Sequence, residues 1–290
     1  MRRVGAVAAL IAMLLLTGCS SLAFFYNRAP ALAYWQLDSY LDLDKAQAPG
    51  ARAAIKAWFT WHRAEELPRY AALLSSLRAE VTGPVSAARI CAINDELRAA
   101  FRRSIDRALP LLPPLASTLG ARQRTHLARR YAEANAELRE TYLDGTPEER
   151  RARTTEGVID ATRALYGRLD EAQRQLIADG VAAAPYDPSQ WLTEREARQQ
   201  HTLAMLARIA ATDPARRNEV ATKAFARTAA SLAKSPHKPY RAYLARLTRY
   251  NCEFIARVHA STTPAQRVRA ARKLQGWADD LRAIARRDDE

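Results

Sequence analysis

The chain has 290 residues and a formal net charge of +14, from 45 Lys and Arg against 31 Asp and Glu. Its hydrophobic content of 48% excludes a disordered polypeptide. Ten glycines argue against Gly-rich phosphate loops, propellers and most sandwiches, and three cysteines are too few for a disulfide scaffold.

The first residues have the pattern of a bacterial lipoprotein signal. Arg2 and Arg3 precede the apolar stretch 4–16, which is too short to cross a bilayer as a helix but suits a signal peptide. The following letters, LTGC, end at Cys19 and resemble the lipobox, where the cysteine is acylated and the chain is cut before it. The alternative is an ordinary secretory signal with a chance cysteine. The lipobox interpretation divides the chain into a signal peptide, an acylated cysteine with a short tether, and one all-helical periplasmic domain, over residues 1–18, 19–29 and 30–287.

The residues after Cys19 bear on localisation. Ser20 and Ser21 resemble a signal for export to the outer membrane, so we expect a lipid-anchored protein that faces the periplasm. That compartment permits disulfides, and the sequence leaves two alternatives for Cys91 and Cys252, a bridge between them or two buried thiols.

The mature chain consists almost throughout of amphipathic patterns, with apolar residues every three or four positions and Arg, Glu and Gln between them. One such stripe is Ile90, Ile93, Leu97, Phe101 and Ile105. We therefore predict an all-α fold, an extended bundle of roughly ten helices with no sheet.

Prolines mark several of the helix ends, because proline lacks a backbone donor and clashes with the preceding turn. The predicted helices span 30–42, 45–66, 68–81, 85–109, 121–143, 147–167, 170–182, 193–211, 214–234, 239–260 and 264–287.

A short motif, L-x-x-x-Q, recurs where helices are expected to begin. A polar residue in the cap position can accept a first-turn N–H, and glutamine three residues later can reach back to the backbone of the cap. The motif therefore predicts helix caps at Asp44, Gln47, Gln123, Asp170, Gln173, Thr263 and Gln266.

The same motif resembles the LTxxQ signature of the CpxP/Spy-like periplasmic chaperones, small all-α proteins whose basic concave surfaces hold unfolded clients. Here Asp or Gly replaces the signature Thr in three copies. A closer resemblance, to a family of bacterial lipoproteins labelled only as a domain of unknown function, is carried by the lipobox and by Tyr34–Gln47, Trp61–Tyr70, Glu133–Leu143 and Asn251–Arg267. It implies a lipid-anchored, helical, exported protein and no particular activity.

His62 and Glu66 are the one pair whose spacing suits catalysis, because residues four apart share a helix face. The interpretation that we favour is a polar contact that fixes the kink before Pro68. We find no motif of a hydrolase, nucleotide-binding or thiol-redox enzyme, and we expect no metal, cofactor or nucleic-acid ligand.

Arginine dominates the basic residues and can recognise phosphate or carboxylate groups. Two helix faces are candidate anion sites, and the alternative is that these residues only solvate the helices. The candidates are Arg98, Arg102, Arg103, Arg107, Arg122, Arg124, Arg129 and Arg130.

Aromatic residues gather in the first helices, at Tyr34, Trp35, Trp58 and Trp61. They suit either the core or a membrane-facing patch.

Three functions fit these observations. The first is a lipid-anchored envelope protein that binds unfolded or acidic envelope proteins or anionic lipids, without catalysis. The second is an accessory subunit of an envelope complex, and the third is an envelope hydrolase or metal-dependent enzyme centred on His62 and Glu66.

Overall fold

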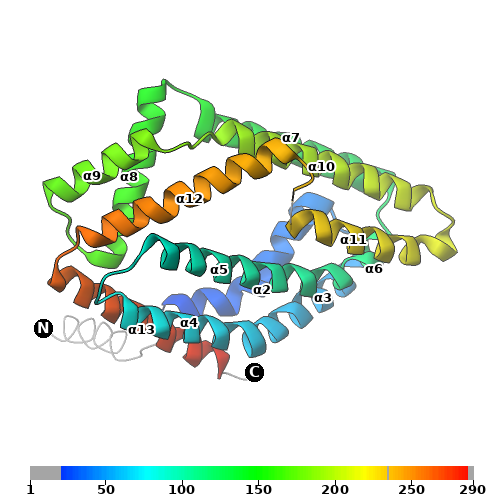
Figure 1. Cartoon of the computed structure of the whole chain (residues 1–290). Helices are drawn as coiled ribbons and strands as arrows, with labels where there is room; N and C mark the ends of the chain where they lie inside the picture. The colour runs from blue at the N-terminus through cyan, green and yellow to red at the C-terminus, as the bar shows by residue number, and fades with distance from the viewer. Residues whose placement is uncertain (1–20, 234, 287–290) are drawn as a thin grey trace, which may run out of the picture.

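A computed structural model describes residues 21–233 and 235–286, and within them the protein is all-α with no strand (Figure 1). The predicted fold class is thus confirmed. The predicted signal peptide and the acylation site Cys19 lie outside the described residues. None of the described helices is long and apolar enough to span a bilayer.

The helices in chain order are α2 (Ser21–Leu41), α3 (Gln47–Trp61), α4 (Leu67–Glu80), α5 (Ala87–Ala108), α6 (Pro113–Ala116), α7 (Ala121–Leu143), α8 (Pro147–Tyr166), α9 (Glu171–Ala183), α10 (Pro188–Ala211), α11 (Arg217–Ala233), α12 (Lys238–Ala260) and α13 (Pro264–Ala285). A π-helical turn, η1 (His62–Glu66), joins α3 to α4, and short 3₁₀ turns, η2 (Leu109–Leu111) and η3 (Pro214–Arg216), precede α6 and α11.

Two prolines that suggested breaks lie inside continuous helical segments. Pro30 is within α2, so the tether expected over 19–29 is helical from Ser21 onward. Ala23 of this first stretch packs against Leu67 and Ile284, which explains why it is ordered as helix. At Pro68 the chain winds into η1, where the N–H of Leu67 donates to the carbonyl of His62, and this wider turn accommodates the ring.

Helix α10 begins five residues earlier than the predicted start at 193. Asp187 explains the difference, because its carboxylate accepts a hydrogen bond from the N–H of Ser189 at 2.9 Å. Pro188 then occupies the first helical position, where its missing N–H costs nothing.

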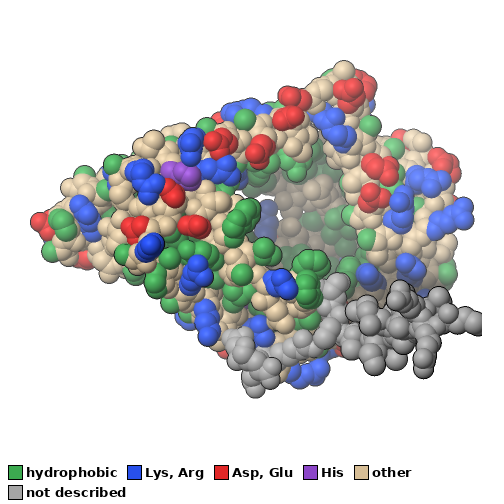
Figure 2. Space-filling view, turned by 180° about the vertical axis from the view of Figure 1, so that it is seen from behind, with side chains coloured by type: hydrophobic (Ala, Val, Ile, Leu, Met, Phe, Trp, Pro, Cys, Tyr) green, Lys and Arg blue, Asp and Glu red, His purple; other side chains and the backbone are tan. Residues whose placement is uncertain are grey.

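The helices form an open frame rather than a compact bundle (Figure 1). Helix α13 lies along α4, α12 along α5, and α7 along α10. Contacts of α2 with α7 and of α13 with α8 connect the two sides of the frame. Figure 2 shows the hollow at its centre, with hydrophobic side chains around it. The accessible surface is 17966 Å², well above the roughly 12,000 Å² of a compact protein of this mass.

Within the described ranges, buried hydrophobic residues accordingly form four separate clusters instead of one core. The largest joins α2, α7, α10 and α11 around Leu127, Met205 and Ile209. A second joins α8, α9 and α12 around Ile177 and Phe254, and the remaining two lie along the α4–α13 pair.

Candidate functional site

Helix α5 carries a predicted core stripe that the fold does not cover. Leu97 is 52% exposed and Phe101 67% exposed, whereas Ile93 and Ile105 of the same stripe are half-buried. We call the surface made by Leu97 and Phe101, with Arg98 and Arg102 beside them, the α5 face. An exposed pair of large apolar side chains, one helical turn apart on a periodic stripe, is the pattern of a binding surface.

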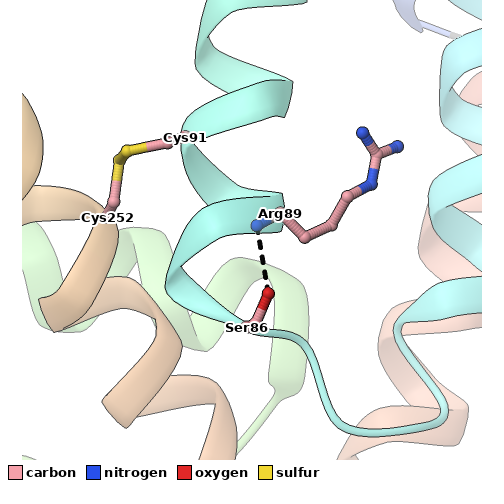
Figure 3. The surroundings of a disulfide bond; sticks show 4 residues. All are labelled: Ser86, Arg89, Cys91 and Cys252. Carbon is pink, nitrogen blue, oxygen red and sulfur yellow. Dashed lines mark hydrogen bonds between the residues drawn. A yellow bond between two sulfur atoms is a disulfide. The ribbon is translucent and has the colours of Figure 1, made fainter.

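The beginning of α5 is held by three kinds of bond. The Ser86 hydroxyl accepts a hydrogen bond from the N–H of Arg89 at 3.1 Å and caps the helix (Figure 3). Cys91 and Cys252 form a disulfide that links α5 to α12, with their Cα atoms 5.4 Å apart. The Arg89 guanidinium binds both oxygens of Glu80 at 2.7 and 2.9 Å, which holds the pKa of that carboxyl below its usual range.

The second half of α5 is held by a buried carboxylate from η1. Glu66 is fully buried, and its two oxygens accept hydrogen bonds from Arg103 at 2.7 and 2.8 Å. Arg69 adds a third bond at 2.7 Å. The bonds from Arg103 are the main reason that the pKa of Glu66 lies below its ordinary value, and they outweigh its burial. Arg103 is therefore a structural partner of Glu66 and not a free anion-binding group.

His62 lies in an aromatic cluster. Its Nδ1 is 2.9 Å from the Tyr26 hydroxyl, and its ring stacks on Trp58 with centroids 4.7 Å apart. Burial lowers the pKa of the imidazole, against the opposing effect of the Glu66 charge. Among the described residues there is no group of three or more His, Cys, Asp or Glu side chains able to hold a metal. The geometry thus gives His62 and Glu66 separate partners that hold the fold.

Some of the remaining candidate arginines are bound to partners within the protein, and others form no ion pair. Arg102 binds Asp106 at 3.1 Å, and Arg124 donates to the Leu119 carbonyl at 2.8 Å. Exposed Arg98 and Arg107 form no ion pair with the other described residues. The two predicted faces are therefore not continuous free cationic surfaces. Acidic partners occupy three other arginines of α7, with Arg122 on Asp42, and Arg129 and Arg130 on Glu133.

The glutamines of the L-x-x-x-Q motif meet in pairs, which sequence spacing did not reveal. The amide of Gln47 donates to Gln123 Oε1 at 3.2 Å, and the amide of Gln123 donates to Gln47 Oε1 at 2.6 Å. Each Oε1 also accepts a backbone N–H at its own helix start, from Asp44 and Gly120. Asp44 supplies the second half of a capping box, since its carboxylate accepts from the N–H of Gln47.

The same arrangement recurs between α9 and α13. Gln173 and Gln266 exchange amide hydrogen bonds of 2.8 and 3.0 Å, and each accepts a backbone N–H, from Asp170 and Thr263. Gln173 also donates to the Ser261 carbonyl at 3.0 Å. The motif thus joins two helix starts at each of two places, and we call these the paired glutamines.

Two apolar recesses lie away from the α5 face. One, of about 670 Å³, is lined mainly by α2, α3, η2 and α6, including Leu37, Ile55 and Leu115. The other, of about 940 Å³, lies among α7, α8, α9, α10 and α12.

No curated protein and no solved structure matches the chain. Neither a lipoprotein description nor a CpxP/Spy-like chaperone is therefore among the matches. One family model does match, over residues 39–222, and its description assigns no activity. Since this match covers more than half of the sequence, the chain belongs to the family of unknown function DUF6279.

Proposed function

We propose that the chain is a lipid-anchored envelope protein, in the outer membrane and facing the periplasm, whose α5 face binds apolar segments of unfolded envelope proteins. The exposure of Leu97 and Phe101 on a stripe that has the periodicity of a core carries this proposal. The function is one of binding and not of catalysis.

The composition of the α5 face suits an unfolded chain. Burying a side chain such as Leu or Phe contributes about 1.5–3 kcal/mol, so even partial coverage by a client segment is favourable. Exposed Arg98 is available to acidic groups of the client, because it forms no ion pair with the other described residues. The disulfide and the Glu66–Arg103 bonds hold α5 in place, so its ordering is not part of the cost of binding.

The proposed anchor is tested by metabolic labelling with palmitate. We expect the wild-type protein to be labelled and to fractionate with the outer membrane, and a Cys19→Ala variant to be unlabelled. Absence of the palmitate label from the wild-type protein would contradict the proposed lipid anchor.

The proposed binding is tested with the acylated protein in phospholipid nanodiscs and a chemically denatured client. We expect it to suppress client aggregation, and a Leu97→Ser/Phe101→Ser variant to need about tenfold more protein for the same effect. Val268→Ser is the matched control, because Val268 is 51% exposed on α13. Equal suppression by the double variant and the wild type would contradict the proposal.

The salt dependence of client binding distinguishes the charged part of the α5 face from its apolar part. Exposed charge interactions are screened at high ionic strength, whereas apolar contact is retained. An Arg98→Gln variant should therefore behave like the wild type at high salt and bind more weakly at low salt. Wild-type behaviour of this variant at both salt concentrations would remove Arg98 from the site.

A further inference from the structure

A second uncovered apolar surface lies on helix α2. Its large side chains are Phe24, Phe25, Leu32 and Trp35, with exposed fractions of 53%, 62%, 57% and 65%. At 100° per residue these four positions fall on one side of the helix. We call them the α2 face.

The opposite side of α2 is committed to the fold. Ala23 packs with Leu67 and Ile284, and Leu41 packs in the largest cluster. The hydroxyl of Tyr26 contacts His62 Nδ1 at 2.9 Å. Rotation of α2 to hide the α2 face would break these contacts, so the exposure belongs to the folded state.

The α2 face carries one cation, and the first acidic residue after it is Asp38, whose carboxylate accepts a hydrogen bond from the N–H of Leu43. Residues 21–37 contain no Asp or Glu, and their one cation, Arg28, lies over the Phe24 ring at 4.6 Å. Arg52 of α3 stacks on Tyr34 at 3.9 Å. Aromatic and aliphatic groups with an arginine among them suit a helix in the interface of an anionic bilayer, because the apolar groups enter the acyl region while the long arginine side chain reaches back to the phosphates.

The place of α2 in the chain indicates how it meets a bilayer. It begins at Ser21, two residues after Cys19, so acyl chains on that cysteine would hold the first turn at the membrane. At 1.5 Å per residue, Phe24 lies about 5 Å and Trp35 about 21 Å along the axis from Ser21. The whole α2 face reaches the surface only if the helix lies along it.

We propose that α2 lies on an anionic phospholipid bilayer with Phe24, Phe25, Leu32 and Trp35 in the interface, and so fixes the orientation of the frame above the membrane. This inference rests on the proposed acylation at Cys19. The competing occupants of the α2 face are a second copy of this chain and the residues before Ser21.

The test uses the acylated protein in phosphatidylethanolamine–phosphatidylglycerol vesicles that contain brominated acyl chains, which quench nearby tryptophan fluorescence. We expect quenching in the wild type and its loss in a Trp35→Phe variant. Trp191→Phe is the matched control, because Trp191 is 39% exposed on α10, outside the α2 face, and its replacement should leave the quenching unchanged. A Phe25→Ser/Leu32→Ser variant keeps Trp35 and should show weaker quenching.

Mass spectrometry of the same sample separates the two proposals. If the protein is not acylated, the anchor fails and this inference fails with it. If the protein is acylated but quenching does not depend on Trp35, the anchor stands and the orientation is overturned. Cross-linking between copies at position 32 in place of quenching would assign the α2 face to a second chain and equally overturn the proposal.

Discussion

At the scale of single residues, the buried carboxylate of Glu66 determines how α5 sits in the frame. It receives bonds from Arg103 on α5 and from Arg69 on its own helical segment. The sequence spacing placed Glu66 beside His62, but it could not show that an arginine 37 positions later would supply the partner. The same contact removes Arg103 from the set of anion-binding candidates.

A Glu66→Gln variant tests this role. The neutral amide cannot balance two guanidinium groups, so we expect the free energy of unfolding to fall by about 2 kcal/mol. The control is Glu65→Gln, since Glu65 is half exposed and makes a longer, weaker contact of 3.4 Å with Arg69. This replacement should change the free energy of unfolding by less than about 0.5 kcal/mol. Similar losses in both variants, measured by urea unfolding, would contradict the assigned role of Glu66.

Protonation of His62 is expected to lower the stability of the folded protein as pH falls. Burial lowers its pKa in the folded protein, so the unfolded chain binds a proton first as pH falls below about 6.5. The contribution of His62 is therefore present above that pH and lost as pH falls through the folded pKa. A His62→Gln variant should lose stability less steeply than the wild type between neutral and mildly acidic pH, and parallel curves would show that His62 is not the cause.

At the scale of elements, local physics predicted where many helices begin, and packing decided how they pair. The capping interpretation of Asp170–Gln173 and Thr263–Gln266 agrees with the hydrogen bonds at those helix starts. Their meeting across 93 positions could not be derived, because a cap is local and a pair depends on the path of the intervening chain. The glutamines of the four motif copies are largely buried, as paired glutamines are expected to be. The sequence alone does not show this burial.

A Gln173→Ala variant tests the paired glutamines. It removes the acceptor of the Asp170 N–H and both amide hydrogen bonds to Gln266, which keeps only its bond to the Arg168 carbonyl and its cap bond from Thr263, so we expect a loss of about 3 kcal/mol in unfolding free energy. Gln175→Ala on the same helix is the control, since Gln175 is exposed and bonds only to nearby Asp179. Calorimetry that finds equal unfolding temperatures for the two variants would show that the pair is not stabilising.

At the scale of the whole molecule, the prediction of an extended all-helical arrangement is confirmed, but the hollow was not foreseen. A periodic stripe predicts one apolar helix face and does not say whether a partner covers it. Leu97 and Phe101 fit a core as well as Ile93 does, and only the tertiary path of α5 leaves them open. The sequence therefore identifies the residues of the apolar stripe, but only the structure shows that Leu97 and Phe101 are exposed.

The disulfide is expected to brace the open frame. It closes a segment of 161 residues between α5 and α12, and a crosslink over so long a loop stabilises by about 5 kcal/mol in the chain-entropy account. Reductant should therefore lower the unfolding midpoint of the wild type and leave that of a Cys91→Ala/Cys252→Ala variant unchanged. An unchanged wild-type midpoint after confirmed reduction would show that the bridge adds no stability.

The most direct test of the α5 face is site-specific photo-crosslinking in the acylated protein. A photoreactive phenylalanine analogue is placed at position 101, and in a matched control at position 268 on α13. With a denatured client present, we predict a crosslinked product from position 101 and little from position 268. Equal crosslinking from both positions, or none from position 101 while aggregation is still suppressed, would contradict binding at the α5 face.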